Sequence, residues 1–215
     1  MNDNLFQAQY DLTKKSRIRK FYEERKYLIF ILIAIILAII ISISFYAENK
    51  KNKIILLSDS YVEAKIYLQG GKRDKAKNKL QEIIFAKDST YSSLALFLMI
   101  KENLLENDQE KMELFNHILE NNKFDKEVKN LIILKKVLSK ENFINESELL
   151  EGLNPLLSSE SLWKPHALLF IGDYFFFNKE YLKAKDFYTQ ILNIKNLHKD
   201  LYEQAKSQIA LINND

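Results

Sequence analysis

An uninterrupted apolar run, residues 27–47, constrains this chain more than any other feature. Its sequence, YLIFILIAIILAIIISISFYA, contains no charged side chain. A helix of this length rises about 1.5 Å per residue and covers the roughly 30 Å hydrocarbon core of a bilayer. Tyr27 at one end, and Phe45 and Tyr46 at the other, are aromatic residues of the kind that favour the membrane interface. The run therefore predicts a single transmembrane helix in contact with the lipid bilayer.

Two alternative interpretations fit the run less well. A buried helix of a soluble protein seldom has apolar residues around its whole circumference over such a length. A cleaved signal peptide has a shorter apolar core, about 7–15 residues, and small residues before the cut. Cleavage after Ala47 would instead place Phe45 at the −3 position. We therefore expect an uncleaved anchor.

The charges on either side of the run predict its orientation. Seven Lys or Arg residues lie between position 14 and the start of the run, and three Lys residues follow it closely. Basic residues are retained on the cytoplasmic side of a membrane. We therefore expect residues 1–26 to be a short cytoplasmic segment, 27–47 the anchor in the bacterial inner membrane, and 48–215 a periplasmic domain. That domain carries 25 basic and 25 acidic side chains, so it has no electrostatic basis for binding nucleic acid.

Residue types that carry out chemistry are scarce. The chain has no Cys, which excludes disulfides, a thiolate metal site and a Cys nucleophile. His117, His166 and His198 are far apart in the sequence, and no HExxH pattern occurs. Gly70-Gly71-Lys72 lacks the spacing of a phosphate-binding loop. We therefore expect a protein that is not an enzyme and that holds no metal and no cofactor.

Residues 48–215 contain turn signals at a nearly constant interval. The four turn positions taken as equivalent are Gly71, Asn107, Glu141 and Lys179. A period near 34 with a helix on each side of a short turn is typical of tetratricopeptide (TPR) repeats. The pattern predicts an all-α fold, a TPR-like α-solenoid of about four helix pairs plus a C-terminal capping helix. The predicted helices are 56–69 and 73–87, 91–106 and 109–121, 125–139 and 145–157, 162–177 and 180–194, and the cap 199–212.

The fourth helix pair carries the clearest copy of the repeat. Gly172 is followed by an aromatic residue, a small residue and a second aromatic residue at the places that the TPR pattern requires, which are Phe175, Ala184 and Tyr188. The small residues let the two helices of a pair approach closely, and the aromatic residues are expected to fill the gap between a pair and its neighbour. The first pair has Ala64, Tyr67, Ala76 and Leu80 at these positions.

The two middle pairs are degenerate. At the first and third of these positions they have Ile100 and Met112 in the second pair, and Leu134 and Glu146 in the third. Because Glu146 stands where a small residue is expected, the register of the third pair stays open by one or two residues. Both prolines lie in residues 153–165, where we expect an irregular loop between the third and fourth pairs.

The first helix of each pair lines the concave side of a TPR stack, and this side usually binds a peptide or a partner protein. Aromatic and aliphatic side chains in such a groove suit an apolar segment. The candidate partner contacts are Tyr61, Lys65 and Leu68 in the first pair, and His166, Leu169, Asp173 and Phe176 in the fourth. His166, near a helix start, is also compatible with a surface or capping role. Residues 175–177 are all Phe, and one helix cannot direct three consecutive side chains into one core. At least one is therefore either covered by the final helix or exposed as a partner-binding patch.

The order of these features resembles a known family. A short segment with Phe6, Asp11-Leu12 and Phe21-Tyr22 leads into one anchor, degenerate TPR pairs follow, and YLKAKDFY at 181–188 precedes a final helix. This order resembles the TPR-like inner-membrane proteins that are ancillary subunits of the SecYEG translocon. The resemblance covers nearly the whole chain. It rests on the length of the chain, the order of its segments and the spacing of its TPR-like turn signals. It implies association with translocon subunits, periplasmic chaperones or exported polypeptides, and assistance in the release or maturation of exported proteins.

Three other possibilities remain open at this point. The same architecture fits an anchored TPR subunit of another envelope assembly, such as cytochrome c maturation or the cell-division machinery. It also fits a mitochondrial receptor with a cytosolic TPR domain, which differs in topology. The exposed end faces of a TPR stack also permit a homodimer.

Overall fold

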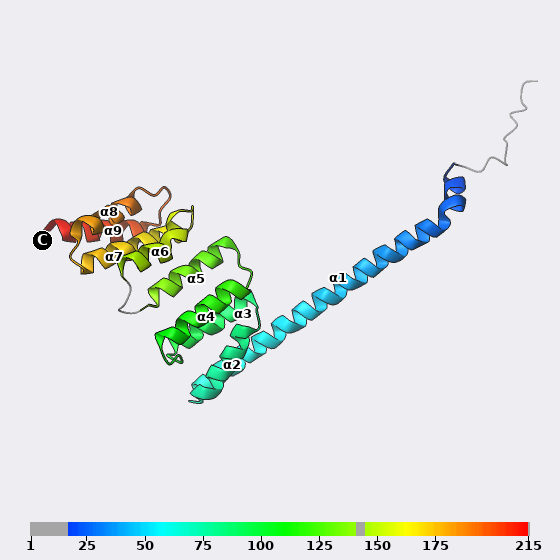
Figure 1. Ribbon diagram of the computed structural model, residues 1–215, viewed down its shortest axis with the longest axis horizontal. Coiled ribbons are helices and arrows are strands. Elements are labelled where there is room, and N and C mark those ends of the chain that lie inside the picture. Colours follow the sequence, from blue (N-terminus) through cyan, green and yellow to red (C-terminus); the bar gives the residue numbers. More distant parts are fainter. Residues whose placement is uncertain (1–16, 141–144, 215) are drawn as a thin grey trace, which may run out of the picture. The chain divides into compact units, whose positions relative to one another are not determined.

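The computed structural model describes residues 17–140 and 145–214 (Figure 1). These residues form nine α-helices and no strand, which confirms the predicted all-α class. The helices are α1 (Arg17–Gln69), α2 (Arg73–Phe85), α3 (Ser89–Lys101), α4 (Asp108–Asn121), α5 (Lys126–Leu138), α6 (Glu146–Leu157), α7 (Lys164–Phe177), α8 (Tyr181–Leu192) and α9 (Lys199–Asn214). Phe6, the Asp11-Leu12 pair and the Glu141-Asn142 turn signal lie outside the described residues.

Helix α1 contains the apolar run. Its backbone departs from helical geometry at Arg25 (φ −121°, ψ 16°) and then continues to Gln69. The 45 residues from Arg25 to Gln69 include a fully exposed apolar window with a mean hydropathy of 3.3. Ser42 satisfies its hydroxyl within the helix by donating to the carbonyl oxygen of Ala38 at 2.8 Å. The described chain thus has one helix long and apolar enough to cross a membrane.

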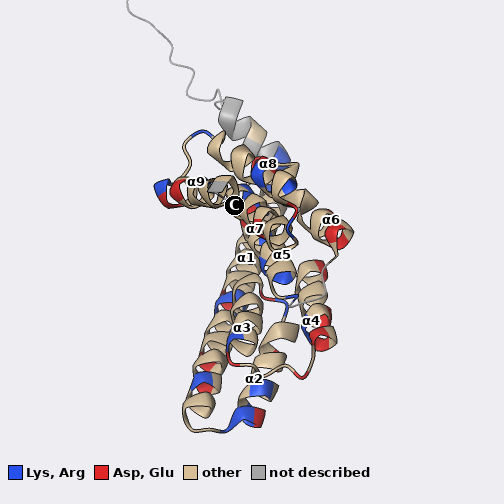
Figure 2. Ribbon diagram, turned by 90° about the vertical axis from the view of Figure 1, so that its left-hand side faces the viewer, with Lys and Arg blue, Asp and Glu red and all other residues tan. Residues whose placement is uncertain are grey.

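The chain divides into two compact units between Leu56 and Leu57. The helix predicted at 56–69 is not a separate element, because it is the C-terminal part of α1. The physical reason is local, since residues 48–69 contain no Gly or Pro that would end a helix. The second unit begins with residues 57–69 of α1 and contains all the later helices. Figure 2 shows acidic and basic residues interspersed over α2–α9.

Side-chain caps begin several helices of the second unit. Asp88 accepts hydrogen bonds from the backbone N–H groups of Thr90 and Tyr91 at the start of α3. Asn107 and Asn145 do the same for N–H groups of α4 and α6. Such caps satisfy N–H groups that have no partner within the helix. Asn107 is therefore an N-cap and not the equivalent of Gly71, which corrects the first of the predicted repeat intervals.

The first helices of three pairs end in the same way. Gly71, Asn103 and Lys179 have positive φ angles of 70°, 49° and 63°. At each of them two backbone hydrogen bonds close the last helical turn, as in the Schellman motif. The left-handed residue at Asn103 explains why α3 ends at Lys101, before the end of the predicted helix 91–106.

The predicted irregular loop over residues 153–165 is wrong in extent. Pro155 lies inside α6 and Pro165 lies in the first turn of α7, where its missing N–H has no helical partner to lose. The non-helical connection is only the segment from Ser158 to Trp163.

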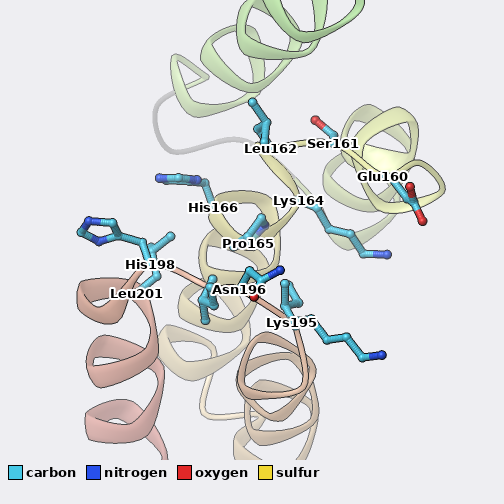
Figure 3. Close-up of a pocket in the computed structure, with 12 residues that line it drawn as sticks. Glu160, Ser161, Leu162, Lys164, Pro165, His166, Lys195, Asn196, His198 and Leu201 are labelled. Carbon is cyan, nitrogen blue, oxygen red and sulfur yellow. The ribbon is translucent and has the colours of Figure 1, made fainter.

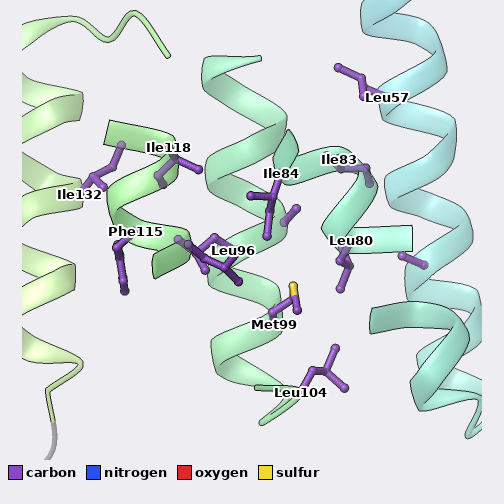
Figure 4. Packing of buried hydrophobic residues seen from close by; sticks show 13 residues of the cluster. Leu57, Leu80, Ile83, Ile84, Leu96, Met99, Leu104, Phe115, Ile118 and Ile132 are labelled. Atoms are coloured by element: carbon purple, nitrogen blue, oxygen red, sulfur yellow. The ribbon is translucent and has the colours of Figure 1, made fainter. Parts of the chain in front are cut away.

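The helices after residue 57 pair as four hairpins: hairpin one (residues 57–69 of α1 with α2), hairpin two (α3 and α4), hairpin three (α5 and α6) and hairpin four (α7 and α8). Their buried residues form two core clusters that meet at α5. The first runs from Leu57 to Ile132 and the second from Leu134 to Ala205. Figure 4 shows how residues of the first cluster, among them Leu96, Phe115 and Ile132, converge from successive helices. Burial of these apolar side chains is the main force that holds the helices together.

Burial also corrects the register of the two middle hairpins. In hairpin four the buried set is Leu168, Ile171, Gly172 and Phe175 on the first helix and Ala184, Tyr188 and Ile191 on the second. In hairpin two the same spacing is buried at Ser92, Ala95, Leu96 and Met99, with Phe115 and Ile118 on the second helix. Leu96, and not Ile100, is therefore the equivalent of Gly172. In the second helix Lys111, and not Met112, is the equivalent of Ala184. In hairpin three Leu149, and not Glu146, takes the place of Ala184.

Candidate functional site

The candidate contacts in hairpin one lie on the C-terminal part of α1. Tyr61 is half-buried, and its ring centroid lies 6.3 Å from that of Tyr91. Burial raises the pKa of Tyr61, so the hydroxyl stays protonated at neutral pH. Leu68 packs against the first core cluster, and Lys65 is exposed. The three side chains thus offer a ring edge, an aliphatic surface and an ammonium group.

The candidate contacts in hairpin four lie on α7 and pack against the second core cluster. Leu169 and Phe176 are half-buried there, and the Phe176 ring lies 5.6 Å from that of Tyr181. His166 is exposed at the first turn of α7. The two sets of candidate residues therefore belong to different core clusters, and each is positioned by its own hairpin.

Asp173 has a partner within the chain. Tyr188 donates a hydrogen bond from its hydroxyl to Asp173 Oδ1 at 2.7 Å. Burial raises the pKa of Asp173, and the hydrogen bond from Tyr188 opposes that rise. Burial and the Asp173 carboxylate together raise the pKa of Tyr188, so the phenol remains the donor. Asp173 therefore links the two helices of hairpin four through this hydrogen bond. Only its remaining acceptor positions are available to a partner protein.

The Tyr188 ring lies directly over Gly172. A Cβ atom at position 172 would come within 2.5 Å of Tyr188 Cε1. The absence of a side chain at Gly172 therefore creates the space that Tyr188 fills, which lies within hairpin four and not between it and a neighbouring pair as expected. Tyr188 and Ala184 are both fully buried.

The three consecutive Phe residues of α7 have different environments. Phe175 is buried, Phe176 is half-buried, and Phe177 is 82% exposed. Helix α9 does not cover Phe177. Leu182, just beyond the turn, is 83% exposed. Of the two alternatives for this segment, the structure has an exposed apolar side chain at the α7–α8 turn.

A polar contact between hairpins three and four fixes the start of α7. Glu127 Oε2 accepts hydrogen bonds from the hydroxyl of Ser161 at 3.0 Å and from the backbone N–H of Leu162 at 2.9 Å. The Trp163 indole N–H donates to the backbone carbonyl oxygen of Glu127 at 2.9 Å. These hydrogen bonds hold the segment from which His166 projects.

A pocket of about 580 Å³ lies between this segment and the connection from α8 to α9. Figure 3 shows His166 and His198 on one side of it, and Lys164 and Lys195 extending to the other. The His166 ring centroid lies 5.4 Å from that of Trp163. Partial burial lowers the pKa of His166, so the imidazole is neutral at neutral pH. The pocket has mixed polar and apolar walls without a convergent set of catalytic groups.

A second pocket, of about 420 Å³, lies between α3, α4 and α5. Its apolar walls include Phe97, Ile100, Phe115 and Leu138. The ring centroids of Phe97 and Phe115 are 6.5 Å apart. Among the described residues, the lining also includes three lysines, Lys101, Lys111 and Lys135, and no acidic residue. We call this feature the lysine pocket.

Sequence reasoning missed the lysine pocket because it named contact positions only in the first and fourth pairs and left the degenerate middle pairs without any. In the corrected register Phe97 and Ile100 are the hairpin-two equivalents of Asp173 and Phe176. Lys135 and Leu138 are the equivalents in hairpin three, counted from Leu134. Two of the candidate positions predicted for hairpin four, those of Asp173 and Phe176, therefore fall on the wall of the lysine pocket when they are carried to the middle hairpins. The sequence contained one signal of the pocket. In the second helix of hairpin two, Lys111 occupies the position that the small residue Ala184 has in hairpin four.

Among the residues that the structure describes, no three His, Cys, Asp or Glu side chains cluster in a way that would hold a metal ion. The groups gathered on the first helices of the hairpins are aromatic rings, aliphatic side chains and ammonium groups, which suit contacts with a polypeptide.

Comparison with known proteins adds no relative. No protein-family model matches the chain, and neither the curated proteins nor the solved structures contain a match.

Proposed function

We propose that this protein is a membrane-anchored, non-enzymatic scaffold that binds other proteins through the first helices of its hairpins. In this proposal residues 27–47 span the bacterial inner membrane with the N-terminus in the cytoplasm. The helices from residue 57 onward form a TPR-like stack in the periplasm. The observation that carries the proposal is the lysine pocket, an open surface of apolar and basic side chains at equivalent positions of two successive hairpins.

The exposed apolar window of α1 supports the anchor. In water such a surface would carry a large free-energy cost, whereas a bilayer removes it. The excess of basic residues before the run supports the cytoplasmic position of the N-terminus.

Contacts between successive hairpins support the repeat architecture. Lys77 forms ion pairs with Glu106 at 2.9 Å and with Glu110 at 3.1 Å, and both partners lie about one repeat further along the chain. The Arg73 guanidinium at the start of α2 donates to the backbone carbonyl oxygen of Asn103, which is 30 residues away at the end of the first helix of hairpin two, at 2.9 Å. Contacts separated by about one repeat are expected where each repeat packs mainly on its neighbours.

The proposed partners are subunits of the Sec translocon, periplasmic chaperones or exported polypeptides. This assignment comes from the resemblance in the order of segments, and the apolar and basic character of the lysine pocket is compatible with it. The scaffold would bring a chaperone or an emerging polypeptide close to the membrane without altering it chemically.

Affinity purification tests the proposed partners. The full-length chain, tagged after Asp215, is purified from gently solubilised membranes, and co-purifying proteins are identified by mass spectrometry. A tagged chain ending at Leu56 is the control for binding through the anchor alone. We expect translocon subunits or periplasmic chaperones to be enriched over this control. Enrichment of cytochrome-maturation or division proteins in their place would contradict the Sec assignment and leave the anchored scaffold.

The absence of Cys from the chain permits a clean test of topology. Single cysteines are introduced as Asn2→Cys and Lys199→Cys, and Lys199 is exposed in α9. In spheroplasts a membrane-impermeant maleimide is expected to label the Lys199→Cys chain and to leave the Asn2→Cys chain unlabelled until the membrane is broken. The reverse pattern would contradict the periplasmic position.

A further inference from the structure

We propose that the lysine pocket binds carboxylate side chains of an acidic and apolar polypeptide segment. This inference rests on the proposed protein-binding function and names the chemistry of the partner. The pocket is built by three helices, with Lys101 at the end of α3, Lys111 in the first turn of α4 and Lys135 in the last turn of α5.

The three ammonium groups are only partly neutralised within the described chain. Lys111 forms an ion pair with Asp108 at 2.7 Å and donates to the backbone carbonyl oxygen of Ser139 at 3.0 Å. An ammonium group has three N–H donors, so one donor of Lys111 remains for a further acceptor. Lys101 and Lys135 are exposed and make no side-chain hydrogen bond or ion pair with the described residues.

The position of Lys111 makes its charge more effective than that of an ordinary surface lysine. Its side chain is only 13% exposed, whereas its partner Asp108 is 52% exposed. Electrostatic interactions are screened less at a partly buried group than at an exposed one. A carboxylate that enters the pocket would therefore be attracted by Lys111 from within and by Lys101 and Lys135 at the rim.

Stabilisation of helix ends explains part of this arrangement but not the whole. Lys101 and Lys135 lie at C-terminal ends of helices, where positive charge is favourable for each helix separately. That effect does not require the two lysines to face one pocket, nor a third lysine in the first turn of α4, where positive charge is unfavourable. Convergence of the three, with no carboxylate among the described residues that line the pocket, indicates an anionic ligand.

The apolar walls indicate which anion. Phe97, Ile100 and Leu138 line the same pocket, and Leu138 is 40% exposed. A small inorganic anion would leave these side chains uncovered, whereas a peptide with apolar residues next to its carboxylates covers them and pairs with the lysines. We therefore assign the pocket to a polypeptide segment in which Asp or Glu alternates with large apolar residues.

The test measures peptide binding by the full-length chain in nanodiscs of zwitterionic lipid. The probe is a short fluorescein-labelled peptide in which Glu alternates with Leu and Phe, and a second peptide has Gln in place of Glu. Fluorescence anisotropy is expected to show tighter binding of the Glu peptide, with an affinity that falls as salt is added. The Lys101→Ala/Lys135→Ala variant is expected to bind the Glu peptide about fivefold to twentyfold more weakly, from two exposed ion pairs.

Matched variants separate this effect from general charge and from loss of fold. Lys123→Ala/Lys206→Ala removes the same charge at two exposed lysines outside the pocket, and it is expected to leave the affinity unchanged. Lys101→Arg/Lys135→Arg keeps the charge and is expected to retain most of the binding. Circular dichroism of each variant checks that the helices are intact.

Three results would overturn the inference: equal binding of the Glu and Gln peptides, no binding of the Glu peptide, or equal losses in the two Lys→Ala variants. These results do not depend on the purification from membranes. Peptide binding without translocon subunits in that purification would contradict the proposed partner alone.

Discussion

Hairpins two and four place different chemistry at the same two positions. In hairpin four Asp173 and Tyr188 form a hydrogen bond of 2.7 Å between the helices. In hairpin two the equivalent residues are Phe97 and Phe115, whose ring centroids are 6.5 Å apart. The two polar side chains of hairpin four bond to each other, whereas the two rings of hairpin two form a wall of the lysine pocket.

The residues next to these two pairs also differ, since they are small in hairpin four and large in hairpin two. Gly172 and Ala184 let the helices of hairpin four approach, and the Tyr188 ring fills the space. In hairpin two Leu96 and Lys111 take their places, and the Lys111 ammonium extends towards α5, where it bonds to Ser139. Hairpin four thus has a filled core, whereas hairpin two contributes to an open pocket.

The largest expected effect is that of adding a methyl group at Gly172. In Gly172→Ala the new Cβ would lie 2.5 Å from Tyr188 Cε1 and 2.8 Å from Cδ1, so a fully buried ring has to move. Overpacking of this kind costs about 1–3 kcal/mol, against which Ala gains about 1 kcal/mol in helix propensity. We expect a net loss of up to about 2 kcal/mol in the free energy of unfolding, measured by urea denaturation followed by circular dichroism.

Gly152→Ala is the matched control in hairpin three. There the nearest atom to a new Cβ is Val137 Cγ2, at 3.0 Å, and a small shift of that methyl group relieves the contact. The propensity gain then roughly offsets the packing cost, and we expect a change within about 0.5 kcal/mol. Equal losses in the two variants would show that the fit between Gly172 and Tyr188 is not special to hairpin four.

A smaller effect is expected from removing the charge of Asp173. Asp173→Asn keeps an oxygen that can accept the Tyr188 hydrogen bond. Because burial raises the pKa of Asp173, the folded state favours the protonated carboxyl. The stability that this protonation contributes is present below the ordinary pKa of 3.8 and is lost as the pH rises through the raised value. At neutral pH the Asn variant should therefore be the more stable chain.

The pH dependence of this difference is the critical measurement. Urea denaturation of both chains from neutral to acidic pH should show the advantage of Asp173→Asn shrinking as Asp173 becomes protonated. An advantage that does not change with pH would mean that ionisation of Asp173 is not what separates the two chains.

The smallest effect is expected at Phe177, whose equivalent in hairpin two is Lys101. Phe177 is 82% exposed, so Phe177→Ser removes little buried apolar surface. We expect the free energy of unfolding to change by less than about 0.5 kcal/mol. A loss of about 1.5 kcal/mol or more would mean that another surface covers this ring, as a homodimer interface would. Analytical ultracentrifugation of the variant and the parent chain in detergent then tests the homodimer directly.

Local sequence determined much of the fold. The uncharged run specified the one long apolar helix, and turn residues such as Gly71 and Lys179 specified the ends of first helices, because such signals act through neighbouring backbone. The match of Gly172 with Tyr188 was also predictable, since one Gly and one large ring at the right spacing leave few alternatives. In hairpin two the same reasoning placed the equivalent of Gly172 at Ile100, about one helical turn too late. Leu96 and Ile100 are both apolar, and only burial distinguishes them.

The tertiary structure alone decided the lysine pocket. Lys101 and Lys135 are a full repeat apart, and Lys111 reads in the sequence as one more charged residue on a solvated helix. Their convergence depends on how α3, α4 and α5 pack, which is set by the shapes of buried side chains from three helices at once. The sequence determined where helices begin, end and meet a membrane, because those signals are local. Which charges share a pocket was decided by packing, because that outcome depends on residues that are distant in the chain.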